Sequence, residues 1–166
     1  MSLVEALQRA LAIEYQVIYG YGVLGAHLTA GKETNAAATP AMALQRLQEH
    51  QDLRDRLAEL VHAAGRTPVT AEPAYRLPYP VTDPSGARRL AQHLENTVAS
   101  AAYAVIAASR PDSPARALMI GALIDAADWQ TRWAVADFAP FAFPFPGRPG
   151  QPAAIQPSTT PTSSPS

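Results

Sequence analysis

The sequence contains no cysteine, which excludes disulfide bridges, thiolate zinc sites, iron–sulfur clusters and cysteine nucleophiles. Charged residues make up only 16% of the chain and the net charge is −1, so no broad electrostatic attraction to nucleic acid or anionic membrane is expected. Apolar runs are shorter than the roughly 20 residues that cross a bilayer, and residues 1–5 lack the basic start of a leader. We therefore expect a cytoplasmic protein that binds neither nucleic acid nor membrane.

Helical periodicity is the dominant pattern in the 166 residues, a length typical of one domain. Apolar residues recur at steps of three and four within residues 2–29, 40–64, 83–109 and 113–137, the spacing of helices that bury one face. In the last segment the expected inward residues include Ile124, Trp129 and Trp133. Each segment opens at a capping residue: Ser2, Thr39, Asp83 and Ser113.

The connections predict the topology. Short loops follow the first and third helices, so each of these helices is an antiparallel neighbour of the next one. The segment formed by residues 65–82 is long and proline-rich. At about 3.1 Å per residue it can run the length of one helix, about 36–40 Å. One long crossover between the second and third helices is the ferritin-like arrangement. Residues 1–137 are therefore predicted to form an all-α, ferritin-like four-helix bundle.

The remaining residues, 138–166, have a different composition. They hold eight of the 16 prolines, and residues 157–166 contain only proline, serine and threonine, which predicts a disordered tail. Residues 138–147 contain four phenylalanines, which would form a sticky patch if exposed. We expect them to fold back on the bundle or to lie at a subunit interface; docking to another partner is the less favoured alternative. The interface interpretation, with family analogy, predicts a homodimer.

Polar side chains on the apolar stripes are the informative ones. Glu14, His50, Glu95 and Asp125 each lie near the middle of a different predicted helix. Carboxylates facing one another repel unless a positive group lies between them. That group is either a metal ion or the side chain of Arg54, one turn after His50.

Two interpretations of this layer follow. The favoured one is a buried hydrogen-bonded network without a cofactor, with Tyr15 or Tyr103 as further members; its main residues are Glu14, His50, Arg54, Glu95 and Asp125. The alternative is a site for Fe or Mn, ions that suit carboxylates with one imidazole; its ligands are Glu14, His50, Glu95 and Asp125. Spacing alone leaves open whether Asp125 or Asp128 faces inward.

Several motifs carry a resemblance to a known group of proteins. They are AIEY and YGYGVLGAHL in the first helix, AYRLPYPVTD in the crossover, and DAA with TRW in the fourth helix. With these motifs the chain resembles the ferritin-like superfamily and, more narrowly, a bacterial ferritin-like domain family of unassigned function. Di-iron members supply a Glu from each of two helices and a Glu-x-x-His pair from each of the others.

The resemblance implies a degenerate di-iron site. Glu14 and Glu95 match the single glutamates and His50 matches a histidine, but Leu47 stands where its paired glutamate would be. The fourth helix keeps neither ligand type of the pair, since it has Asp125-Ala-Ala-Asp128. We therefore favour a structural or interaction domain over an enzyme.

Two alternatives belong to other functional classes. One is an Fe- or Mn-binding protein with redox or iron-handling activity. The other is a small-molecule binder that uses space left by Gly22 and Gly25 near Tyr21 and the tryptophans.

Overall fold

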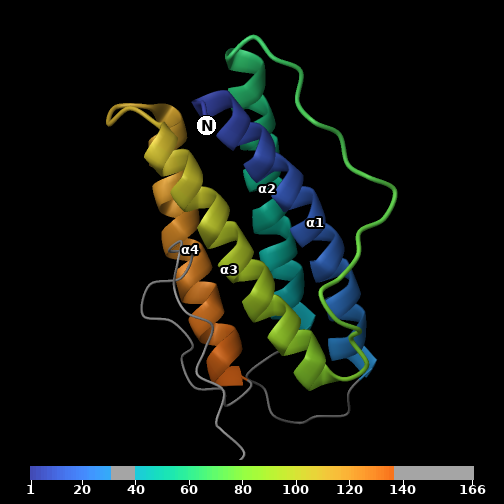
Figure 1. The fold of residues 1–166 in the computed structure, drawn as a ribbon. Coiled ribbons are helices and arrows are strands. Elements are labelled where there is room, and N and C mark those ends of the chain that lie inside the picture. Colours follow the sequence, from blue (N-terminus) through green and yellow to red (C-terminus); the bar gives the residue numbers. More distant parts are fainter. Residues whose placement is uncertain (31–39, 137–166) are drawn as a thin grey trace, which may run out of the picture.

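Four long α-helices make up the fold that the computed structural model describes over residues 1–30 and 40–136 (Figure 1). They are α1 (Leu3–Ala30), α2 (Pro40–Ala63), α3 (Pro84–Ala108) and α4 (Pro114–Ala136). Those residues contain no strand, so the predicted all-α four-helix bundle is confirmed. No helix within them is long and apolar enough to cross a membrane.

The helices are not packed evenly around the bundle axis. Helix α1 packs against both α2 and α3, and α3 packs against α4, whereas α2 and α4 approach each other at few points. The connection between α2 and α3 runs from one end of the bundle to the other along α1 (Figure 1). Gln8 of α1 holds this crossover, because its side chain donates to the Thr67 carbonyl and accepts from the Val69 amide. The long crossover expected from the prolines is therefore present.

Local capping explains why the helix ends agree with the sequence pattern to within a residue or two. At the start of α1, the Ser2 hydroxyl accepts from the Glu5 amide and the Glu5 carboxylate accepts from the Ser2 amide, which is a capping box. Asp83 caps α3 by accepting from the amide of Gly86. After α2, Gly65 has a φ of 71°, the left-handed conformation that ends many helices.

The inward face of α4 differs from the prediction. Trp129 and Trp133 are buried as expected, but Ile124 is 64% exposed. Most of the buried positions on α4 are alanines, among them Ala115, Ala122 and Ala126. Because α4 carries apolar residues on every side, its periodicity does not reveal which side meets α3.

One glycine of α1 marks a close helix approach. A Cβ atom at Gly20 would lie 2.7 Å from Cδ1 of Leu94 on α3, whereas a Cβ at Gly22 would meet nothing within 4 Å. We expect Gly22→Ala to stabilise the fold by about 0.5–1 kcal/mol through helix propensity. Gly20→Ala is expected to destabilise it, because overpacking costs about 1–3 kcal/mol. Urea unfolding of the two variants checks this, and equal gains in both would contradict a close approach at Gly20.

The segment over residues 138–166, including the phenylalanines expected to fold back or to lie at an interface, is outside the described residues. The same holds for Thr39, the predicted cap of the second helix.

Candidate functional site

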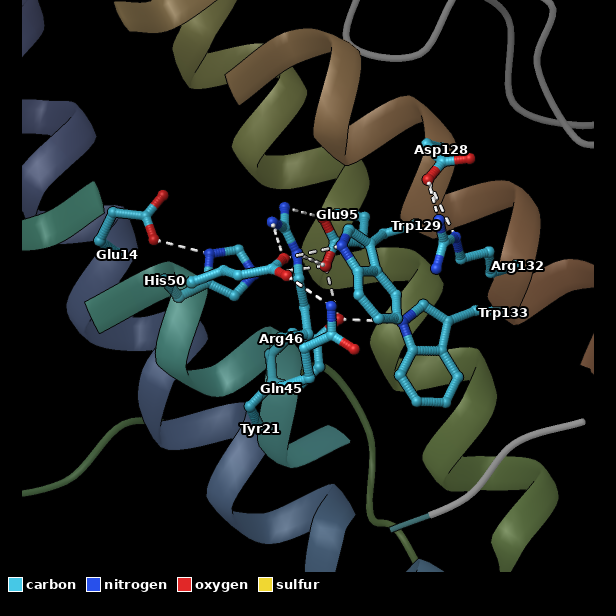
Figure 2. A network of polar contacts seen from close by, with 11 residues as sticks. Glu14, Tyr21, Gln45, Arg46, His50, Glu95, Asp128, Trp129, Arg132 and Trp133 are labelled. Carbon is cyan, nitrogen blue, oxygen red and sulfur yellow. Dashed lines mark hydrogen bonds and ion pairs between the residues drawn. The ribbon is translucent and has the colours of Figure 1, made fainter. Parts of the chain in front are cut away.

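Glu95 of α3 is the centre of a buried polar layer and has no exposed surface (Figure 2). Arg46 of α2 binds it with two parallel hydrogen bonds, from Nη2 to Oε2 at 2.7 Å and from Nε to Oε1 at 3.0 Å. The Tyr21 hydroxyl of α1 donates to Oε1, and Nε2 of His50 lies 3.3 Å from the same oxygen. Side chains of α1 and α2 thus converge on one carboxylate of α3, which accepts bonds on both oxygens.

His50 connects Glu95 to a second buried carboxylate. Its Nδ1 lies 2.9 Å from Oε2 of Glu14 on α1, and the exposed fractions of His50 and Glu14 are 0% and 1%. An imidazolium has an N–H on each ring nitrogen, so a protonated His50 donates to both carboxylates at once. Two buried carboxylates are then balanced by two cations, His50 and Arg46.

The layer extends on two sides to the tryptophans of α4 (Figure 2). The indole N–H of Trp133 donates to the Tyr21 hydroxyl at 3.0 Å. On the other side Arg46 also binds Glu49 at 3.1 Å, and the indole of Trp129 donates to Glu49 at 2.8 Å. The network therefore ties α4 to α1 and α2 where few backbone contacts join α4 to α2.

The pKa shifts follow from burial opposed by pairing. Burial disfavours the charged form of His50, but the Glu14 and Glu95 carboxylates outweigh it and raise the pKa of His50. Burial likewise opposes ionisation of Glu95, and bonds from His50 and Arg46 outweigh it, so the pKa of Glu95 is lowered. Burial and the neighbouring Glu95 raise the pKa of the Tyr21 phenol well above its usual value. Pairing thus favours the charged forms of His50 and Glu95, and the surroundings of Tyr21 favour its neutral phenol.

The structure brings together three of the predicted site residues, Glu14, His50 and Glu95, and places the others elsewhere. Asp125 is exposed, so its prediction as an inward residue of the layer is wrong. Arg54 pairs with the adjacent Asp55 at 2.7 Å near the surface, so its place in the network is also a wrong prediction.

The sequence also left open a role for Asp128 and for a tyrosine in the layer. Asp128 is exposed and pairs with Arg132 at 2.8 Å, so neither aspartate of α4 faces the layer. Tyr103 is 43% exposed, and the tyrosine in the layer is Tyr21.

Arg46 is the cation of the layer that the sequence interpretation missed. It lies one turn before His50, as Arg54 lies one turn after it, so spacing from His50 does not separate the two. A signal was nevertheless present, because Ala43, Arg46 and His50 follow the three-and-four spacing of the buried face of α2. Side chains of helices also lean towards the helix N-terminus.

A groove lies beside this layer, between α2 and α4. Its volume is about 310 Å³, and its lining includes Asp52 and Arg56 of α2 together with Leu118, Gly121 and Asp125 of α4. Arg46 and Glu49 form its inner wall, so the buried network meets the surface here. Among the described residues, no group of three or more His, Asp or Glu side chains is arranged to hold a metal ion.

The stability of the bundle is expected to fall as pH rises above neutrality. A raised pKa means that His50 holds its proton more tightly in the folded state than in the unfolded chain, where a histidine has a pKa of about 6.5. The stabilisation is complete below that value and is lost as pH rises through the higher folded pKa. The pKa of Glu95 is lowered by folding, so its ionised form stabilises the bundle at pH values above the usual carboxyl pKa. This stabilisation is lost as pH falls through the folded pKa.

Urea unfolding between pH 5 and 9 measures this dependence. His50→Gln is expected to remove the alkaline decline, whereas the control His62→Gln, at an exposed position near the end of α2, retains it. A wild-type stability that stays flat from neutral to alkaline pH would contradict a charged His50.

Comparisons with known proteins place the chain in a family. Residues 6–150 match the family described as "Domain of unknown function (DUF4439)". The structure resembles the crystal structure of a conserved hypothetical protein from Mycobacterium tuberculosis, with a TM-score of 0.68 and 32% sequence identity. This likeness covers 80% of the present chain and 94% of the mycobacterial one. No curated protein matches the chain. The chain thus belongs to the DUF4439 family of domains.

Proposed function

We propose that this chain is a ferritin-like bundle whose polar centre has become a structural ion-pair network, and that it acts as a structural or interaction domain rather than as a di-metal enzyme. The long crossover supports the superfamily assignment, as do Glu14, His50 and Glu95, which meet at one level of the bundle. The observation that carries the proposal is the guanidinium of Arg46, which binds both oxygens of Glu95.

The donor set does not fit a resident pair of Fe or Mn ions. A guanidinium keeps its charge at every accessible pH. Arg46 therefore provides the positive charge that a metal ion would otherwise bring to Glu95, and it repels such an ion. Glu95 is already engaged by three side chains, and Asp125 lies at the surface. Within residues 1–30 and 40–136, only Glu14, His50 and Glu95 remain as buried ligand types, fewer than a di-iron centre uses.

Metal analysis of the untagged protein tests this proposal. After anaerobic incubation with Fe(II) or Mn(II) and desalting, we expect far less than one ion per chain and no rise in the melting temperature. Stoichiometric metal that is lost in Glu14→Ala but kept in Asp128→Ala, at an exposed position, would overturn the proposal and make redox or iron-handling chemistry the working hypothesis. The wild-type measurement alone decides the matter if Glu14→Ala fails to fold.

Small-molecule binding is a second candidate function, favoured by the groove between α2 and α4 rather than by Gly22, which is exposed. The groove is lined by three carboxylates, those of Glu49, Asp52 and Asp125, and by two guanidiniums, those of Arg46 and Arg56. This excess of negative charge beside Leu118 suits a small amine with an apolar body. Chemical-shift titration with butylamine tests this. The control is Gly121→Leu, since a Cβ at this lining position meets nothing within 4 Å and the longer side chain fills the groove. Shifts of groove residues that vanish in the variant support the candidate, and shifts absent from the wild type exclude it for this probe.

The predicted homodimer stays a prediction. Light scattering at several protein concentrations measures it directly, and a monomer at all of them would remove it.

A further inference from the structure

The outward side of α4 carries a stripe of exposed apolar side chains. Ile120, Ile124 and Val135 are 40%, 64% and 57% exposed. Because a helix turns by 100° per residue, positions separated by 4 and 11 residues lie on the same face. Ala127, half-buried, lies at the edge of this stripe, and two exposed polar residues, Asp128 and Thr131, lie on it between Ile124 and Val135. This stripe, hereafter the α4 outer face, extends over most of the helix.

The α4 outer face is not an edge of the bundle core. Helix α4 packs on α3 through its opposite, alanine-rich side, and α2 approaches it at few points. Of the charged groups around it, Asp128 and Arg132 bind each other at 2.8 Å, and Arg116, one turn before Ile120, donates to the Ile106 carbonyl at 2.7 Å. Large exposed aliphatic side chains that share one face indicate a surface that something covers.

We propose that the α4 outer face is the docking surface of the chain's own phenylalanine-rich segment, residues 138–147. This segment begins two residues after α4 ends at Ala136, and it contains all four phenylalanines of the protein and no charged residue. Its apolar rings therefore match the exposed aliphatic side chains of this face. The assignment rests on α4 and on the length of chain that follows it, and it does not depend on the metal-free centre proposed above.

The lengths agree with this occupant. From Ala136 back to Ile120 the helix covers 16 residues, or about 24 Å at 1.5 Å per residue. An extended proline-containing chain covers about 3.1 Å per residue, so the ten residues 138–147 reach about 31 Å. Pro140, Pro144 and Pro146 have no N–H group, which lowers the number of backbone donors that contact with an apolar surface would desolvate.

The tether favours this segment over a second copy of the chain. A short linker holds an attached segment at an effective concentration in the millimolar range, far above the concentration of separate chains in a dilute sample. Docking within one chain also covers both apolar surfaces at once. A partner protein that binds the same face would have to displace the segment.

The absence of cysteine allows a direct test on the full chain. Ile124→Cys places a single thiol on the α4 outer face, and its reaction rate with a disulfide reagent reports whether the face is covered. In the same chain Phe138, Phe141, Phe143 and Phe145 are replaced by serine. We expect the thiol to react about tenfold faster in the chain without phenylalanines. This factor applies if the segment covers the thiol about nine-tenths of the time and the thiol reacts only when uncovered. Leu44→Cys, at a 56% exposed position of α2, is the control and keeps its rate when the phenylalanines are replaced.

The dependence of the thiol protection on protein concentration identifies which segment or molecule covers the face. Protection of position 124 that is the same at all protein concentrations and is lost with the phenylalanines supports the proposal. Protection that grows with concentration assigns the face to a second copy and overturns it, as does a rate that the serine substitutions leave unchanged. Circular dichroism shows that each variant keeps its helices. None of these readouts measures metal, so failure here is distinct from failure of the proposed function.

Discussion

Replacing Arg46 by leucine is expected to destabilise the bundle by about 3–5 kcal/mol, the usual cost of removing one partner of a buried ion pair. The arginine is 3% exposed and binds both oxygens of Glu95, which has no exposed surface. Without it, Glu14 and Glu95 share only the charge of His50, and the layer keeps one uncompensated negative charge. Urea unfolding at pH 6, where His50 is protonated, measures the loss.

Arg54→Leu is the matched control, since it removes the same side chain one turn beyond His50 on the same helix. Arg54 pairs with its neighbour Asp55 near the surface, and such pairs contribute about 0–1 kcal/mol. Adding Glu95→Met to Arg46→Leu is expected to recover part of the loss, because it removes the orphaned charge and leaves the Glu14–His50 pair intact. Equal effects of Arg46→Leu and Arg54→Leu would contradict the assignment of Arg46 to the network.

Trp133→Ala is expected to cost a similar amount, about 3–5 kcal/mol, for a different reason. Trp133 has no exposed surface, and its ring packs against Tyr21 and Trp129 with centroid distances of 6.3 and 6.2 Å. Alanine leaves a cavity where α4 meets α1, and α4 has few other large buried residues to close it. Thermal and urea unfolding both report this change.

Trp133→Phe separates packing from hydrogen bonding at the same position. Phenylalanine keeps most of the ring volume but cannot donate to the Tyr21 hydroxyl, a bond of 3.0 Å. Loss of one such hydrogen bond costs about 1–3 kcal/mol when a buried partner is left unsatisfied. A phenylalanine variant as unstable as the alanine variant would show that the Tyr21 contact, not ring packing, dominates at this position.

The helices, their ends and the order in which they connect follow from local features of the sequence. Capping by Ser2 and Asp83 acts within three residues, so neighbouring residues suffice to predict it. The prolines between α2 and α3 predict a long crossover for the same local reason. Glu14, His50 and Glu95 were recognisable because each interrupts an otherwise apolar stripe at mid-helix, where an unpaired charge is costly.

The groups that neutralise those charges are selected by the packing of the helices and not by local sequence. Arg46 and Arg54 are equally spaced from His50, and the way α2 and α3 each pack on α1 brings Arg46 to Glu95. In α4, apolar residues surround the helix, so only its packing on α3 decided that alanines face inward and that Asp125 and Ile124 face outward. Periodicity specifies a buried face only where the opposite face is polar. Where both faces are apolar, or two cations are equidistant, the choice depends on contacts between helices.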